Sequence, residues 1–258
     1  MFVKYTLKTV LLFITAAALT VLFSGKPAWA LTAEVTPQDI PIKLFYHGAN
    51  LNIDGKCGPN DDLIVRVGNE AEDAHMKFKG KAAGIFWMKI GDMSFEHVPA
   101  AYLLATSKNL DSLLGKAEQI REGIGFESIK AGAAIESSAE GMDKDRWINE
   151  FIKFKKEEKL YRIEEGTITK QAGEYHLEMN WPYQAAPGTY NIEVLAVRDG
   201  KIVDRAESSL TVARKGIVAQ LTALAFDQAA VYGIIAIVIA MVAGFAVGAL
   251  FKGGGGAH

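Results

Sequence analysis

Soft metal ligands are the side chains of this chain with the clearest potential for chemistry. The 258 residues include one cysteine, Cys57, with seven methionines and five histidines. Thiolate, thioether and imidazole groups are the ligands that select copper(I) or zinc. The histidines are scattered singly, and Met76, Met88 and Met93 lie near two of them in the sequence. We therefore predict no metal site, and keep as an alternative a metal-handling or redox accessory protein that uses Cys57 and nearby His and Met.

Cys57 has no second cysteine with which to form an internal disulfide, so the core must stabilise the fold. Its simplest role is that of a buried structural thiol. The turn-like residues around it, Asp54 to Pro59, could instead expose it as a reactive thiol or for an intermolecular disulfide.

The sequence carries no familiar catalytic motif. It contains no C-x-x-C, no G-x-S-x-G elbow and no H-E-x-x-H helix. Asp54, Asn60, Asp61 and Asp62 could surround calcium, but they lack the alternating spacing of a calcium loop, and Asp and Asn are common in turns. We predict no catalytic residue and no cofactor, and hence a protein that is not an enzyme, since an enzyme would need a dispersed site.

The C-terminal apolar segment is the feature with the most direct physical function. Val231 to Phe251 is a run of 21 residues without a charge, and a helix of that length is about 30 Å long, the thickness of a bilayer's hydrocarbon core. Small residues recur along it at every fourth position: Ala236, Ala240, Gly244 and Gly248. Small residues at this spacing let two membrane helices approach closely. We predict that this face packs against another membrane protein or against a second copy; a general enrichment of spans in Ala and Gly is the alternative.

The N-terminus predicts export. Lys4 and Lys8 precede an apolar run, and Ala28-Trp29-Ala30 completes a signal peptide over residues 1–30, with an uncleaved anchor helix as the alternative. The transmembrane helix, 231–251, then stops transfer and leaves a cytoplasmic tail, 252–258. We predict a single-pass protein of the bacterial inner membrane, with a periplasmic N-terminal domain and a cytoplasmic C-terminus.

The charge of the exported part limits its partners. Between the two apolar segments, 24 Lys and Arg stand against 30 Asp and Glu, a net charge of −6. An acidic surface argues against nucleic acid and against docking on anionic lipid headgroups.

Short β-branched runs separated by turns predict an N-terminal β portion over 31–108, which includes strands at Leu44 to Gly48 and, as an apolar interior strand, Ile85 to Met88. A C-terminal β portion over 166–214 has the clearest alternation, with Tyr175, Leu177, Met179 and Trp181 on one face. Asp199-Gly200 predicts a tight hairpin. Strands in this arrangement indicate an immunoglobulin-like β-sandwich, or two.

A helical insertion over 109–165 separates the two β portions. Apolar residues at intervals of three and four predict one amphipathic helix from Leu110 to Ile124 and another around Trp147 to Phe154, with Asp143 as its N-cap. The helices either pack on one sandwich or separate two half-sandwiches. A further amphipathic helix over 215–230 leads into the span.

The order of these features resembles the uncharacterised proteobacterial "putative transmembrane protein" family. The resemblance rests on Trp87 in an apolar strand, the segment Val98 to Ser107, the strand opened by Pro187-Gly188-Thr189-Tyr190, Arg198-Asp199-Gly200, and Val231-Tyr232-Gly233 at the start of the span. It implies a signal peptide, a periplasmic β-rich domain and one C-terminal transmembrane helix. It also implies an association with anion exporters, and it supplies no catalytic residues.

The sequence thus predicts a mainly β fold with a helical insertion and one transmembrane helix. The predicted function is that of a non-catalytic, partner-binding or accessory subunit of an envelope or transport complex. Its expected partners are the lipid bilayer and another membrane or periplasmic protein, such as an anion exporter, or a second copy of the chain.

Overall fold

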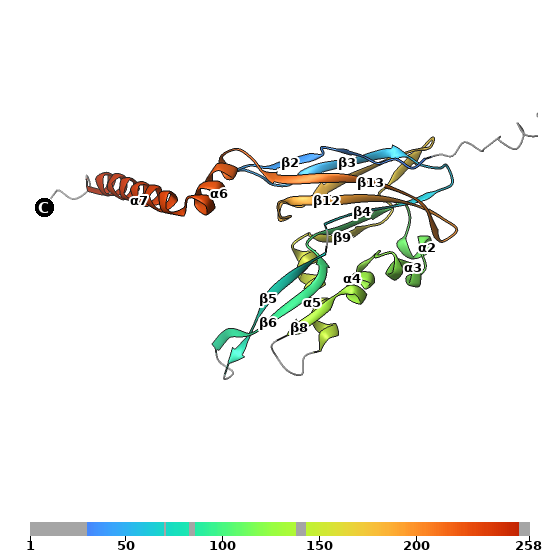
Figure 1. The fold of residues 1–258 in the computed structure, drawn as a ribbon, viewed down its shortest axis with the longest axis horizontal. Coiled ribbons are helices and arrows are strands. Elements are labelled where there is room, and N and C mark those ends of the chain that lie inside the picture. The colour runs from blue at the N-terminus through green and yellow to red at the C-terminus, as the bar shows by residue number, and fades with distance from the viewer. Residues whose placement is uncertain (1–29, 70, 83–85, 138–142, 253–258) are drawn as a thin grey trace, which may run out of the picture.

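The computed structural model describes residues 30–69, 71–82, 86–137 and 143–252, and it is built mainly from strands (Figure 1). Within these residues, sheet A has the order β1-β3-β11-β10: β1 Glu34–Thr36, β3 Ala49–Lys56, β11 Glu174–Trp181 and β10 Thr169–Gln171. Sheet B has the order β2-β13-β12-β4-β7-β9: β2 Asp39–Ile42, β13 Lys201–Arg214, β12 Gly188–Arg198, β4 Asp62–Gly68, β7 Tyr102–Thr106 and β9 Tyr161–Glu164. Sheet C has the order β5-β6-β8: β5 Ala71–Ala82, β6 Phe86–Pro99 and β8 Ala134–Ser137. The predicted mainly β fold with a helical insertion is confirmed.

The two β portions of the chain build the same two sheets. In sheet A, β3 pairs antiparallel with β11, and in sheet B, β4 pairs antiparallel with β12. Each of these pairs joins a strand of 31–108 to a strand of 166–214. Of the two arrangements that the sequence left open, the structure therefore has the single sandwich.

The inner core lies between sheets A and B. The alternation predicted for β11 is confirmed, since Tyr175, Leu177, Met179 and Trp181 are all buried. They belong to one cluster with the apolar residues of sheet B that face them, which include Val65, Leu103, Ile192 and Val194. Burial of large aliphatic side chains at about 25 cal/mol per Å² is the main source of stability for such a sandwich.

A second core covers the outer face of sheet B, so this sheet is buried on both sides. Ile64, Leu104 and Leu195 of sheet B pack there with the helical insertion and sheet C. Phe95 of β6 stacks on Phe151 with ring centroids 4.4 Å apart. The molecule therefore has three layers: sheet A, sheet B, and helices together with sheet C (Figure 1).

The second predicted helix is α5, Lys144–Glu157. Asp143 is its N-cap, as predicted, and accepts a hydrogen bond from the backbone N–H of Arg146 at 3.2 Å. Ile148, Phe151 and Ile152 form its buried face. Lys155, also on α5, donates from Nζ to the backbone oxygen of Ala100, between β6 and β7, at 3.1 Å. Burial lowers the pKa of this lysine.

The first predicted helix is wrong as one continuous element. Residues 110–132 form three short helices instead: α2 Leu110–Leu113, α3 Lys116–Arg121 and α4 Phe126–Gly132. Gly123 and Gly125 have φ angles of 69° and 85°, a left-handed region that ends a helix and that glycine adopts without strain. The apolar spacing continues through these breaks because α2 and α4, with Ile124 between α3 and α4, pack on the second core. α3 adds no residue to that core, and its Ile120 is 46% exposed.

Two predicted strands also need correction. The run from Leu44 to Gly48 is a connection between β2 and β3, because these strands belong to different sheets and the chain must cross from one layer to the other. Ile85 lies outside the described residues, and Phe86 at the start of β6 is 70% exposed. This end of β6 is not an interior strand, since it extends beyond the core as half of a two-stranded ribbon.

The Asp199-Gly200 hairpin is confirmed between β12 and β13. The φ angles of these residues are 52° and 75°, as a two-residue hairpin turn of type I′ requires.

The C-terminal helices stand apart from both cores. α6, Ile217–Asp227, has no buried residue, and α7, Ala229–Lys252, extends away from the sandwich (Figure 1). Its segment Ala229–Ala249 is long and apolar enough to cross a membrane, and the 18-residue window that defines it is 0% buried. The predicted lead-in helix and span correspond to these two elements, whereas the predicted signal peptide and the tail from residue 253 lie outside the described residues.

Candidate functional site

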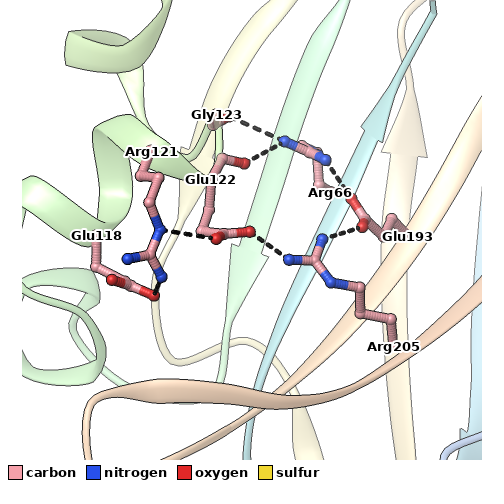
Figure 2. A network of polar contacts seen from close by, with 7 residues as sticks. All are labelled: Arg66, Glu118, Arg121, Glu122, Gly123, Glu193 and Arg205. Carbon is pink, nitrogen blue, oxygen red and sulfur yellow. Dashed lines mark hydrogen bonds and ion pairs between the residues drawn. The ribbon is translucent and has the colours of Figure 1, made fainter.

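Three strands and one helix end bring a group of charged side chains together on the outer face of sheet B (Figure 2). Arg66 of β4 and Glu193 of β12 are directly opposite in the strand register and form an ion pair. Arg66 Nη1 also donates to the backbone oxygens of Glu122 and Gly123, at 2.8 and 3.1 Å. One side chain thus joins the sheet to the connection between α3 and α4.

Arg205 of β13 makes the second link to the same connection. Its Nη1 lies 2.9 Å from Glu193 Oε1, and its Nη2 pairs with the Glu122 carboxylate. Arg121 continues the network from Glu122, at 3.2 Å, to Glu118 (Figure 2). We call these six residues the charge network: Arg66, Glu118, Arg121, Glu122, Glu193 and Arg205.

The charge network is internally neutral and partly shielded from water. The side chains of Glu193 and Glu122 are only 14% and 17% exposed. The hydrogen bond from Arg205 lowers the pKa of the Glu122 carboxyl, and the same bond raises the pKa of the Arg205 guanidinium. Three cations therefore balance three anions, and the hydrogen bond between Arg205 and Glu122 favours the charged form of both groups.

Tyr102 of β7 holds the connection between α3 and α4 by two hydrogen bonds. Its hydroxyl accepts from the backbone N–H of Gly125 at 2.8 Å and donates to the Gly123 oxygen at 3.2 Å. Burial raises the pKa of Tyr102 to about 12, so the phenol is neutral at physiological pH. It serves as a hydrogen-bonding anchor and not as a base.

A cavity of about 450 Å³ opens beside the charge network. Arg66, Tyr102 and Glu193 form part of its wall, and His97 lines it with a φ angle of 60°. Its remaining polar lining comes from Asn69, Ser128, Asn191, Glu207 and Ser208. The wall combines paired charges with amide and hydroxyl groups, which could form hydrogen bonds with a polar group.

Cys57 lies in the inner core with an exposed fraction of 0%. Burial raises the pKa of its thiol, which disfavours the reactive thiolate. Within the part of the chain that the structure describes, no group of three or more His, Cys, Asp and Glu side chains is arranged to hold a metal ion. The reactive thiol and the metal-handling alternative remain predictions without support from this geometry.

The acidic residues considered for calcium each have a different basic neighbour. The Asp61 carboxylate accepts from Arg198 Nε at 2.9 Å, the Asp62 carboxylate lies 2.9 Å from Lys108 Nζ, and Asp54 lies 2.6 Å from the His176 ring. These pairs divide the carboxylates among different neighbours and do not form one ligand shell.

The predicted helix-packing residues lie together along α7. Ala236, Ala240, Gly244 and Gly248 are all exposed, and nothing lies within 4 Å of a Cβ placed on either glycine. The structure therefore leaves this face uncovered by the described domain.

The family comparison agrees with this arrangement. The family model described as "Putative transmembrane protein (Alph_Pro_TM)" matches residues 30–253. The chain belongs to this family. The match includes the β domain and the C-terminal helices. The family description and the candidate span Ala229–Ala249 therefore both indicate a membrane protein. No curated protein and no solved structure matches the chain.

Sequence reasoning missed the charge network. Its one local signal was Arg66, a charge inside the apolar run from Leu63 to Val67. The partner Glu193 is 127 positions away along the chain, and no local spacing relates the two.

Proposed function

We propose that the chain is a single-pass inner-membrane protein whose periplasmic, immunoglobulin-like β-sandwich is a non-catalytic accessory subunit that binds a partner in an envelope or transport complex. The observation that carries this proposal is the bare face of α7. Inside lipid, close packing at small residues is a main source of helix association, and this face has no partner among the described residues.

Two features support the proposed orientation. Asp227 precedes the span and Lys252 follows it, which agrees with positive residues on the cytoplasmic side. The family match also begins at residue 30, the last residue of the predicted signal peptide.

A pair of leucine substitutions on opposite faces of α7 tests the packing. Gly244→Leu places a bulky side chain in the small-residue row, while Ala246→Leu adds similar bulk about 200° around the helix. After mild detergent extraction of the tagged full-length chain, we expect Gly244→Leu to lose the co-purifying partner and Ala246→Leu to keep it. A complex that survives Gly244→Leu would contradict the proposal.

The same experiment distinguishes the partners. A second, differently tagged copy in the complex identifies a homodimer, whereas a transporter, with an anion exporter as the first to examine, identifies a hetero-complex. Protease added to spheroplasts tests the orientation: we expect the sandwich to be cleaved and a C-terminal tag to be protected.

A further inference from the structure

A two-stranded ribbon leaves the body of the molecule in the third layer. β5 and β6 pair antiparallel from Ala71 and Pro99 to Ala82 and Phe86, and among the described residues β8 pairs with β6 from Met93 to Glu96. We call residues 75–82 and 86–91 of this hairpin the basic arm. In Figure 1 it projects away from sheet B, and β5 forms an edge of sheet C.

The basic arm has a composition opposite to that of the domain that carries it. It holds Lys77, Lys79, Lys81 and Lys89 and no Asp or Glu, within an exported region whose net charge is −6. The first three lysines stand at every second position of β5, with a register shift between Phe78 and Lys79. The register pairs Lys79 with Lys89, and it pairs Lys77 with Asp92 just beyond the arm. The average acidity of the exported part, which argued against anionic headgroups, thus conceals a local cluster of positive charge.

Aromatic residues accompany the lysines. Phe78, Phe86 and Trp87 belong to the arm, and the described side chain of Phe86 is 70% exposed. Lys77 is exposed, and Lys89 is 48% exposed although it pairs with Asp92 at 2.6 Å. Lysine beside aromatic residues is the composition of protein segments that sit at the boundary between headgroups and acyl chains.

The position of the arm relative to the span fits a contact with the same membrane. α7 fixes where the bilayer begins, and α6 before it exposes the apolar side chains of Ile217, Leu221 and Phe226. In Figure 1, where the longest axis is horizontal, the end of the arm reaches the same level along that axis as α6. The end of the arm and the start of the span can therefore both reach the surface of one bilayer.

We propose that the basic arm docks on the anionic phospholipid headgroups of the membrane that α7 spans, as a second point of attachment. A neighbouring protein strand added to the edge of β5 is the less favoured occupant, because lysines on an edge strand oppose strand addition. The docking rests on the membrane span of the proposed function but needs no partner protein, so a failed docking test would leave the proposed partner binding untouched.

The test uses the full-length chain in nanodiscs of phosphatidylcholine alone or with phosphatidylglycerol, and follows amide hydrogen exchange over residues 75–91. We expect slower exchange with the anionic lipid only, reversed by high salt, since screening weakens such contacts. The triple variant Lys77→Glu, Lys79→Glu, Lys81→Glu should lose this protection, at about fivefold per lysine removed.

A matched variant, Lys116→Glu, Lys144→Glu, Lys201→Glu, changes exposed lysines away from the arm and should keep the protection. Exchange in β11 reports whether each variant is folded. Equal exchange in neutral and anionic nanodiscs would overturn the proposal. So would protection that persists in the arm variant, because another occupant would then cover the arm.

Discussion

Arg66 joins two layers of the molecule through a single side chain. Replacing it with methionine keeps the aliphatic stem but removes the pair with Glu193 and the bonds to the oxygens of Glu122 and Gly123. Loss of charged hydrogen bonds that are partly buried costs about 1–3 kcal/mol. We expect Arg66→Met to lower the free energy of unfolding by this amount, measured by urea denaturation.

An exposed ion pair provides the control for Arg66. Lys116 pairs with Asp111 on the surface, with both side chains more than half exposed. Because such pairs contribute about 0–1 kcal/mol, Lys116→Met should leave the urea midpoint nearly unchanged. Equal effects of the two substitutions would show that the charge network does not stabilise the fold.

Glu122 makes the stability of the domain depend on pH in the acidic range. Its pKa is lower in the folded protein than its ordinary value, because Arg205 donates to the carboxylate. As the pH falls, the Glu122 carboxyl of the unfolded chain takes up a proton first, near its ordinary pKa of about 4.3. The stability that the carboxylate contributes is therefore present above this pH, and it is lost as the pH falls from there through the lower pKa of the folded protein. We expect Glu122→Gln to be less stable than the native protein at neutral pH but to lose less stability on acidification, measured by thermal melting across this range. An unchanged acid dependence would refute the role of Glu122.

At the scale of elements, Asp143 starts the helix that covers the outer core. It accepts from the N–H of Arg146, and substitution of an N-cap residue by alanine typically costs about 1 kcal/mol. We expect Asp143→Ala to lower the thermal midpoint by several degrees, while Asp145→Ala, two residues further along, should cost only a few tenths of a kcal/mol, about the value of a charge in the first turn. Circular dichroism melts measure both, and the reverse order of effects would remove Asp143 as the cap.

Elements could be predicted where their signal is local. β11 alternates residue by residue and α5 has its cap and apolar face within a short stretch, so both follow from sequence. The series Leu110 to Ile124 has a helical spacing although it crosses a break after α2 and another after α3, because residues on either side of α3 face the same core. The charge network could not be predicted, since the pairing of β4 with β12 that creates it depends on the whole topology.

At the scale of the whole molecule, the same topology explains why the domain and the span are separable. Both β portions are needed for sheets A and B, yet α6 and α7 add no residue to either core. The β domain therefore loses no core residue when the membrane segment is removed. The small-residue face of the membrane segment, in turn, is not covered by the described domain.

A fragment of residues 31–215 tests this separation. It retains every strand of sheets A and B, so we expect it to remain in the soluble fraction with a cooperative thermal transition near that of the full-length chain. A fragment of residues 31–198 lacks β13, which pairs with β12 along most of its length and with β2, and it should fail to fold. If the fragment 31–215 were instead as protease-sensitive as the shorter one, the sandwich would depend on the membrane segment for its stability, and the two parts would act as one unit.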